Sequence, residues 1–439
     1  MISIFASHGA GRLARTLTAV GAVFIAATAC YDAGKILDQD APSRVTATDL
    51  DNPNYAQLLV NSAIGDFECA FTQYIVATGL VGDELIDAQL SQAGWDYDRR
   101  TIFPASGPYS LFQCGQTQVP ALYTPLAVAR FDADKILKEL QGWTDAQVAN
   151  RQSLIATAAV YAGYSLELLG EAMCSGAIDL GPEMMRQQLF AAAEARFTTA
   201  ITAATGTNPT MLKAAYVGRA RARLNQNNLT GAGADAALVT DSTFVLSASY
   251  SATATRRENM VWSQMYRGLF SSVDPSYRGL TFGGVADPRV TVVDAGVKGQ
   301  DSNTEIWRQT KYTTISSSIP IARYAEAQLI LAEADNAANN TAAAVNIINA
   351  LHAKAGIPAY AGGTQDEVQT QIIEERRREL FLEGQRFGDL IRYNIAIQPA
   401  PGAPFPVKGG SYGPNTGLQL CFPLPDVERN NNPNIGKTS

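Results

Sequence analysis

The segment from Gln89 to Phe103 carries residue types that suit the binding of a sugar. Trp95 lies here beside Asp96 and Arg99. A sugar offers apolar C–H faces and hydroxyl edges, so a site for one needs an aromatic platform next to carboxylates, amides and guanidinium groups. In the alternative interpretation, the aromatic residues of this segment pack inside a loop. The residues of the candidate site are Asp83, Gln92, Trp95, Asp96, Tyr97 and Arg99.

Three further aromatic residues, Trp262, Tyr266 and Trp307, lie in the middle of the chain. The region around them, residues 241–318, is rich in Ser, Thr, Gly and Pro without a helical period, which predicts loops with a few short strands or hairpins. Long irregular segments in a compact domain are usually functional or disordered, and the aromatic content favours function. We therefore expect these residues to add contacts to the ligand. Trp307 could instead be anchored to the scaffold, because basic residues follow it.

The composition excludes several kinds of catalytic and metal site. Beyond the N-terminal segment the chain has a single histidine, His352, so an H-E-x-x-H zinc site or any site with two histidines cannot form. No glycine-rich phosphate-binding loop occurs. We expect no catalytic residue, no metal and no cofactor, and hence no enzyme activity. A glycosidase stays open as an alternative, because two carboxylates from distant positions can assemble its site.

The first 29 residues have the pattern of a secretory signal peptide. Two arginines precede an apolar run from Leu17 to Ala27, and small residues then lead to Cys30. A cysteine at the first mature position is typical of bacterial lipoproteins. We therefore expect residues 1–29 to be a lipoprotein signal peptide, Cys30 to be lipidated, and residues 30–45 to form a tether to the membrane. The alternative is an ordinary signal peptide followed by a chance cysteine.

The chain is acidic, with 34 Lys and Arg against 41 Asp and Glu and a net charge of −7. Loss of the signal peptide would remove two arginines and give (34 − 2) − 41 = −9. This balance argues against nucleic acid as a partner, because phosphate binding needs a basic patch. Four cysteines follow Cys30, and they allow three disulfide pairings, of which we favour Cys69–Cys114. The other two are Cys174 and Cys421.

Helical periodicity dominates most of the remaining chain. Asn208-Pro209 separates two predicted helices, 193–204 and 212–224, whose faces carry small residues. Small residues at these spacings let helices pack closely, as in tetratricopeptide repeats, although no strict repeat period is visible. We predict a mainly α fold for residues 46–439. It is a single domain with tetratricopeptide-like helix pairs as scaffold, long irregular ligand-binding loops and a few short strands.

Residues 374–392 predict a helix with a charged surface and an apolar stripe. Opposite charges stand four residues apart, as in Glu374 and Arg378. The run Arg376-Arg377-Arg378 could form a basic patch for an anion or a nucleic acid. Three glutamates stand close to the arginines, and they favour a structural helix whose arginines hold neighbouring elements in place.

Several motifs follow one another toward the C-terminus: Arg323–Ala334, Ala344–Ile357, Glu375–Arg392, Phe422-Pro423-Leu424-Pro425 and Asn432-Pro433. In this order they resemble the SusD/RagB family. Near the N-terminus, Gly82-Asp83-Glu84-Leu85 also fits. His352 and Lys354 stand where arginines are usual in the second C-terminal motif. The C-terminal signature region spans about residues 319–439.

This resemblance implies an outer-membrane lipoprotein, anchored by lipid and facing the cell exterior. Such a protein binds a nutrient, most often an oligosaccharide and sometimes a peptide. It delivers the nutrient to a TonB-dependent transporter of the SusC type, over which it acts as a lid. The resemblance also places ligand-binding residues in the region of Trp95. A helical scaffold or lid protein that binds a partner but no ligand stays open as an alternative.

Overall fold

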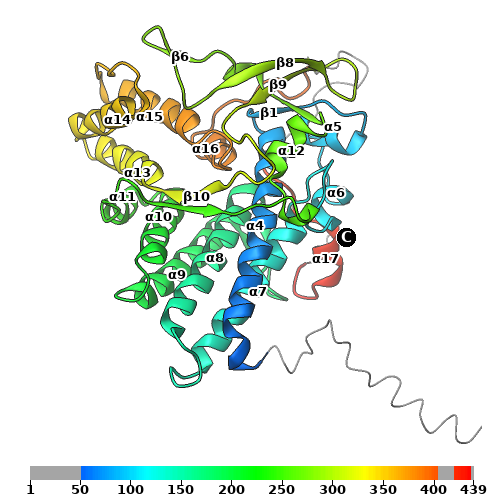
Figure 1. Ribbon diagram of the computed structural model, residues 1–439, viewed down its shortest axis with the longest axis vertical. Coiled ribbons are helices and arrows are strands. Elements are labelled where there is room, and N and C mark those ends of the chain that lie inside the picture. The colour runs from blue at the N-terminus through cyan, green and yellow to red at the C-terminus, as the bar shows by residue number, and fades with distance from the viewer. Residues whose placement is uncertain (1–50, 404–419, 437–439) are drawn as a thin grey trace, which may run out of the picture. The chain divides into compact units, whose positions relative to one another are not determined.

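The computed structural model describes residues 51–403 and 420–436 (Figure 1). The chain divides into an N-terminal unit, Met1–Asn52, and a compact unit, Pro53–Ser439. The predicted signal peptide, Cys30 and the tether lie outside the described residues.

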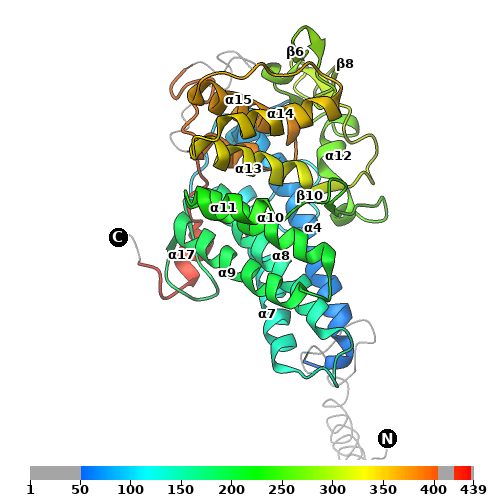
Figure 2. The ribbon, with the colours of Figure 1, turned by 90° about the vertical axis from the view of Figure 1, so that its left-hand side faces the viewer.

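Long helices form the scaffold of the compact unit. In sequence, α7 packs on α4, α8 on α7, α9 on α8 and α10 on α9, and Figures 1 and 2 show them side by side. The prediction of a mainly α fold built on packed helix pairs is confirmed. The bounds are η1 (Pro53–Tyr55), α4 (Ala56–Val81), α7 (Tyr123–Gly142), α8 (Arg151–Ala172), α9 (Arg186–Ala204), α10 (Pro209–Asn225) and α11 (Leu229–Ala236).

Small residues allow the close packing of α8, α9 and α10. The ring of Phe197 on α9 lies against Gly163 of α8 and Gly218 of α10, and a Cβ at either glycine would lie 2.7 Å or 2.3 Å from the ring. The predicted break before α10 is also confirmed, because Pro209 is its first residue and the Asn208 side chain accepts a hydrogen bond from the backbone N–H of Met211.

Among the described residues, only α8 is long and apolar enough to cross a membrane by length and hydropathy. Of its most apolar window, 89% is buried inside the compact unit. It also carries Glu171, which accepts hydrogen bonds at 2.7 and 2.5 Å from the buried guanidinium of Arg221 on α10. α8 is therefore the central core helix of the scaffold.

The C-terminal helices carry the charged motifs and tie them to one another. Arg376 is buried and donates to Asp389 at 2.8 Å, and Arg378 donates to Glu374 at 2.6 Å. The expected structural role of these arginines is confirmed, because their charges are held by carboxylates of the scaffold. The bounds are α13 (Tyr324–Ala337), α14 (Thr341–Ala355), α15 (Gln365–Glu379), α16 (Arg386–Arg392) and α17 (Asp426–Asn431).

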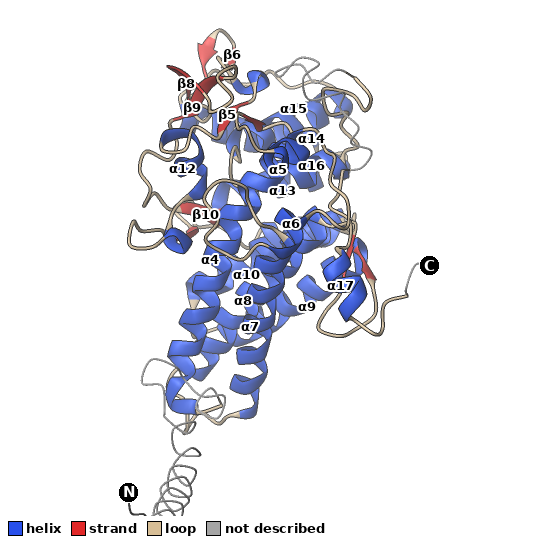
Figure 3. Ribbon diagram, turned by 90° about the vertical axis from the view of Figure 1, so that its right-hand side faces the viewer, coloured by secondary structure: helices blue, strands red, loops and turns tan. Residues whose placement is uncertain are grey.

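Short antiparallel strand pairs and short helices accompany the scaffold, and many of them gather at one end of it (Figures 1 and 3), whereas the pair of residues 175–176 and 184–185 packs against α8 and α9. The loops and hairpins predicted for residues 241–318 are confirmed, although this region also contains the helix α12 (Met260–Tyr266). Two more short helices are α5 (Gln92–Asp98) and α6 (Gly107–Leu111), and the 3-10 turns here are η2 (Thr255–Arg257) and η3 (Pro275–Tyr277). The strand pairs are β1 (Leu85–Asp87) with β5 (Ser271–Val273), β2 (Ser175–Gly176) with β3 (Met184–Met185), β4 (Val245–Ala248) with β10 (Ile319–Arg323), β6 (Thr281–Phe282) with β7 (Val285–Ala286), and β8 (Val292–Lys298) with β9 (Glu305–Gln309).

Two disulfides join distant parts of the compact unit. Cys69 of α4 pairs with Cys114, and Cys174 pairs with Cys421. The second disulfide precedes Phe422, whose buried ring contacts the rings of Tyr97, Tyr109 and Phe387, so the closing motif is part of the core beneath α5 and α6.

Candidate functional site

Three of the residues predicted from the first aromatic segment line one pocket. Gln92, Asp96 and Tyr97 project from α5, and α6 with the loop before it closes the other side. The pocket has a volume of about 280 Å³. Its remaining lining residues are Ala93, Ile102, Ser106, Gly107, Pro108 and Tyr109.

Hydrogen bonds fix the polar groups around this α5 pocket. The Asp96 carboxylate accepts hydrogen bonds from Thr101 at 2.6 Å and Arg99 at 3.2 Å. The Tyr97 hydroxyl donates to the carbonyl of Pro120 at 2.6 Å, and burial raises its pKa well above the usual value, so it stays a donor. Trp95 is half-buried and donates from Nε1 to the Gln89 carbonyl at 2.8 Å. Asp96 is thus the charged group that lines the pocket.

A stacked aromatic pair forms the second part of the candidate site. Trp262 and Tyr266 stand four residues apart on α12, which places them on one helix face. Their ring centroids are 5.5 Å apart with an interplanar angle of 3°, and both side chains are half-buried. The guanidinium of Arg308 from β9 lies 4.9 Å from the Tyr266 centroid. We refer to this stacked pair as the aromatic platform.

The edges of both rings are anchored to the backbone. Trp262 Nε1 donates to the Thr313 carbonyl at 3.1 Å, and the Tyr266 hydroxyl donates to the Gln309 carbonyl at 2.8 Å. Arg308 donates from Nε to the carbonyl of Met265 at 3.0 Å. Burial raises the pKa of Tyr266, so this hydroxyl also stays protonated. Hydrogen bonds to the backbone therefore hold the edges of both rings in place.

Trp307 does not join this stack. It is the neighbour of Arg308 on β9, and consecutive strand residues point to opposite faces. Arg308 covers Tyr266, whereas the Trp307 ring lies under the guanidinium of Arg278, 4.9 Å from its centroid. The backbone N–H of Trp307 donates to Ser272 at 2.8 Å. The structure thus places Trp307 against the hairpin scaffold.

The α5 pocket and the aromatic platform lie at the same end of the compact unit, where Figure 3 shows α5, α6 and α12. The loop that contains Gln118 contacts residues next to both parts of the site. The Gln264 side chain of α12 donates to the carbonyl of Gln118 at 2.9 Å, and the Gln89 side chain before α5 donates to the same carbonyl at 3.4 Å. Gln264 is fully buried, so the spacing between the two parts is held by a buried contact.

Asp83 has a different position from the other predicted residues. Its carboxylate accepts two hydrogen bonds from Arg386, at 2.9 and 2.6 Å. The adjacent Glu84 accepts one from the backbone N–H of Leu382 at 2.7 Å and so holds the turn between α15 and α16. Burial raises the pKa of Glu84 to about 7. Asp83 and Glu84 thus connect the motif Gly82-Asp83-Glu84-Leu85 to the C-terminal motif Glu375–Arg392 and the turn within it.

Sequence reasoning did not assign Arg308 or the residues of α6 to the site. Arg308 meets Tyr266 only because β9 packs against α12, and no periodicity within either segment predicts that contact.

Among residues 51–403 and 420–436, no three His, Cys, Asp or Glu side chains lie close enough to hold a metal ion. Residues 409–413 match the pattern G-x-S-x-G, which in α/β-hydrolases surrounds a nucleophilic serine, and they lie outside the described residues.

Comparison with known proteins agrees with this architecture. Residues 297–438 match a sequence model of the SusD family. The SusD-like protein P38 from Formosa agariphila is 33% identical over 91 residues, which are 19% of this chain and only 18% of that protein. The crystal structure of a SusD superfamily protein from Bacteroides vulgatus ATCC 8482 superposes with a TM-score of 0.66 at 15% identity, over 88% of this chain and 98% of that one. A laminarin-binding SusD-like protein superposes with a TM-score of 0.62 at 17% identity, over 88% and 98% of the two chains.

The two kinds of comparison support one assignment. The sequence match covers the charged C-terminal motifs, and the structural match covers most of the chain. Residues 297–438 of this chain are thus similar to the SusD family, and the fold of the compact unit is similar to that of SusD superfamily structures.

Proposed function

We propose that this protein captures an oligosaccharide at the outer face of an outer membrane, to which Cys30 anchors it, and delivers the sugar to a TonB-dependent transporter of the SusC type. The observation that carries the proposal is the stacked pair of Trp262 and Tyr266 with Arg308 beside it. The neighbouring pocket adds the polar groups of α5.

Each part of the site suits a different part of a sugar. The stack offers an apolar ring face for the C–H face of a pyranose ring, and Arg308, which lies over the Tyr266 ring, supplies N–H donors beside it. In the α5 pocket, Asp96 can accept hydrogen bonds from hydroxyl groups, and the exposed amide of Gln92 can both donate and accept. The stacked rings, Arg308 and the polar groups of α5 together bind a sugar and break no bond in it.

Affinity for glucan oligosaccharides is the first test. The name of the laminarin-binding relative suggests laminarin oligosaccharides as the first probe, with short peptides as the second. Calorimetry on the chain from Tyr31 onward, with product analysis, should show saturable binding without cleavage. Trp262→Ala should weaken this binding about 10- to 100-fold, because a fully buried large apolar side chain contributes about 1.5–3 kcal/mol. Trp143→Ala is the control, because Trp143 lies at the end of α7.

The outcomes separate the alternatives. Sugar binding that survives Trp262→Ala unchanged would refute the platform as the site. Saturable binding of peptides but of no sugar would show that the ligand is a peptide. Cleavage of the sugar would show that the protein is an enzyme.

The anchor and the transporter need tests of their own. Cys30→Ser should move the protein from the membrane fraction to the soluble fraction of cells that produce it. The wild-type protein, purified from membranes in mild detergent, should carry a TonB-dependent transporter that mass spectrometry identifies. Recovery of the protein without any transporter would contradict the delivery step and leave sugar capture intact.

A further inference from the structure

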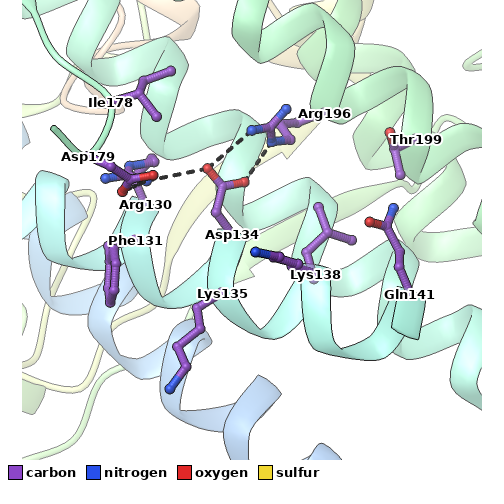
Figure 4. Close-up of a pocket in the computed structure, with 11 residues that line it drawn as sticks. Arg130, Phe131, Asp134, Lys135, Lys138, Gln141, Ile178, Asp179, Arg196 and Thr199 are labelled. Carbon is purple, nitrogen blue, oxygen red and sulfur yellow. Dashed lines mark hydrogen bonds and ion pairs between the residues drawn. The ribbon is translucent and has the colours of Figure 1, made fainter. Parts of the chain in front are cut away.

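A second pocket, far along the scaffold from the aromatic platform, combines positive charge with an exposed aromatic ring. It lies between α7, α9 and the segment after β2 and has a volume of about 440 Å³ (Figure 4). Pockets of this size hold small-molecule ligands in proteins. The lining residues are Arg130, Phe131, Asp134, Lys135, Leu137, Lys138, Gln141, Ile178, Asp179, Arg196 and Thr199.

Cations outnumber acids in this α7–α9 pocket. The two acids are both engaged: Asp134 accepts from Arg196 at 2.6 Å, and Asp179 accepts from Arg130 at 2.8 Å. The Arg130 side chain is only 6% exposed and also lies 3.6 Å from Asp134. Figure 4 shows these four charges as a connected row along the pocket. The row fixes the guanidinium groups in place, as a preorganised site requires.

Two cationic groups in the pocket keep free hydrogen-bonding capacity. Arg196 contacts Asp134 through Nε and Nη2, and among the described residues its Nη1 has no hydrogen-bond partner. Lys138 is exposed, and no acid of residues 51–403 or 420–436 lies within ion-pair distance of its ammonium. Lys135 adds a third charge at the rim, where Glu139 approaches it only to 3.7 Å. Arg196 Nη1 and the Lys138 ammonium are therefore available to donate hydrogen bonds to an anion.

The neutral groups of the pocket indicate what carries that anion. Phe131 is 48% exposed, so its ring offers an apolar face, and the Gln141 amide and Thr199 hydroxyl add neutral hydrogen-bonding groups. A bare anion would use none of these groups, whereas a sugar acid would use both kinds. We propose that the α7–α9 pocket is a second binding site, specific for an anionic saccharide that carries a carboxylate or sulfate group.

The acidity of the whole chain does not argue against this site. The net charge is −7, but charges further apart than about 8–10 Å are largely screened at physiological ionic strength. The local excess of cations therefore decides the affinity. Because the pocket shares no lining residue with the aromatic platform, the inference stands independently of the proposed function.

The test is calorimetry of the chain from Tyr31 onward with a tetramer of galacturonic acid, a neutral tetramer of glucose and inorganic sulfate. We expect saturable binding of the galacturonic acid tetramer that weakens as salt rises. Lys138→Gln should weaken it about tenfold, which is about 1.4 kcal/mol, because the variant loses a charged hydrogen-bond donor to the anion. Lys354→Gln is the matched control, because Lys354 is also an exposed helical lysine. Circular dichroism should show unchanged folding in both variants.

A second variant separates a saccharide site from a simple anion site. Phe131→Ala should weaken binding of the galacturonic acid tetramer and leave sulfate binding unchanged. Tetramer binding that Lys138→Gln and Phe131→Ala both leave intact would overturn the proposal, as would no binding of the tetramer at all. Binding of anionic phospholipid vesicles without binding of the tetramer would assign the pocket to a membrane surface and would equally overturn it.

Discussion

Asp83 and Arg386, 303 positions apart in the sequence, form a two-pronged ion pair with nitrogen–oxygen distances of 2.9 and 2.6 Å. Their side chains are 20% and 7% exposed, so the pair is largely shielded from water. It joins the segment before β1 to the start of α16. Since the same segment leads into α5, this pair connects the C-terminal motif to the base of the candidate site.

Asp83→Asn tests whether Asp83 serves the scaffold. Removal of one partner leaves the charge of Arg386 buried and unpaired, so the free energy of unfolding should fall by about 2–4 kcal/mol. Affinity for the saccharide should stay unchanged at a temperature where the variant is folded. Denaturant unfolding and calorimetry measure the two quantities. A loss of affinity in a variant of normal stability would show instead that Asp83 contacts the ligand.

Trp262 and Trp307 should differ in their effect on binding. Trp262 stacks on Tyr266, and Trp307 faces Arg278 on the other side of β9. We therefore expect Trp262→Ala to reduce affinity for the oligosaccharide and Trp307→Ala to reduce stability alone. Calorimetry and thermal unfolding of both variants provide the comparison. Equal losses of affinity would contradict the separation of the two faces of β9.

Glu326 on α13 predicts a fall in stability as the pH rises. Burial raises its pKa to about 7, although Arg221 and Arg376 favour the ionised form, and its oxygens accept no hydrogen bond from a described residue. Below the usual carboxyl pKa the group is protonated in both states. Between that pKa and about 7, only the folded state keeps the proton, so stability is lost as the pH rises through this window.

Glu326→Gln should therefore be more stable than the wild type at pH 8, by on the order of 2–3 kcal/mol, and equal to it at pH 4. Denaturant unfolding across this pH range measures the difference. Glu84, whose pKa is also about 7, keeps part of the pH dependence in the variant. A destabilised Glu326→Gln at pH 8 would mean that the charge of Glu326 is needed to balance Arg221.

His352 on α14 also stabilises the folded state more at low pH than at high pH. Burial opposes its charge, but the hydrogen bond with Glu375 raises its pKa above the usual value. Its two ring nitrogens each lie 2.7 Å from an acceptor, the carbonyl of Pro358 and the carboxylate of Glu375, so the protonated ring satisfies both. The stabilisation is complete below the ordinary histidine pKa and is lost as the pH rises through the raised one.

His352→Gln should lower the free energy of unfolding at pH 6 by about 1–3 kcal/mol and by less at pH 9. Unfolding curves at the two pH values test this. An equal loss at both would show that the neutral ring makes the same contacts and that protonation contributes nothing.

Gly218→Ala tests the close packing of α9 and α10. The added Cβ would lie 2.3 Å from the Phe197 ring, so overpacking should lower stability by about 1–3 kcal/mol. Gly142→Ala is the matched control, since nothing lies within 4 Å of its Cβ position at the end of α7. Thermal unfolding of the two variants gives the comparison. A stable Gly218→Ala would mean that Phe197 moves aside without cost.

The sequence by itself determined the helical scaffold and the structural role of the charged C-terminal motifs. Helical periodicity, the break at Asn208-Pro209 and the mixture of Glu and Arg around Arg376 are local signals, and they depend on residues a few positions apart. The aromatic content of residues 241–318 pointed to Trp262 and Tyr266, but the sequence did not predict the short helix α12, which places the two rings on one face.

Only the tertiary structure decided which of these groups meet. The contact of Arg308 with Tyr266, the separation of Trp307 from that pair, and the attachment of Asp83 to Arg386 all arise between segments that are distant in the sequence. The α7–α9 pocket has the same origin, since α7 and α9 bring Lys138 and Arg196 to one cavity across a long stretch of chain. Packing between elements sets such contacts, and no spacing within a single element encodes them.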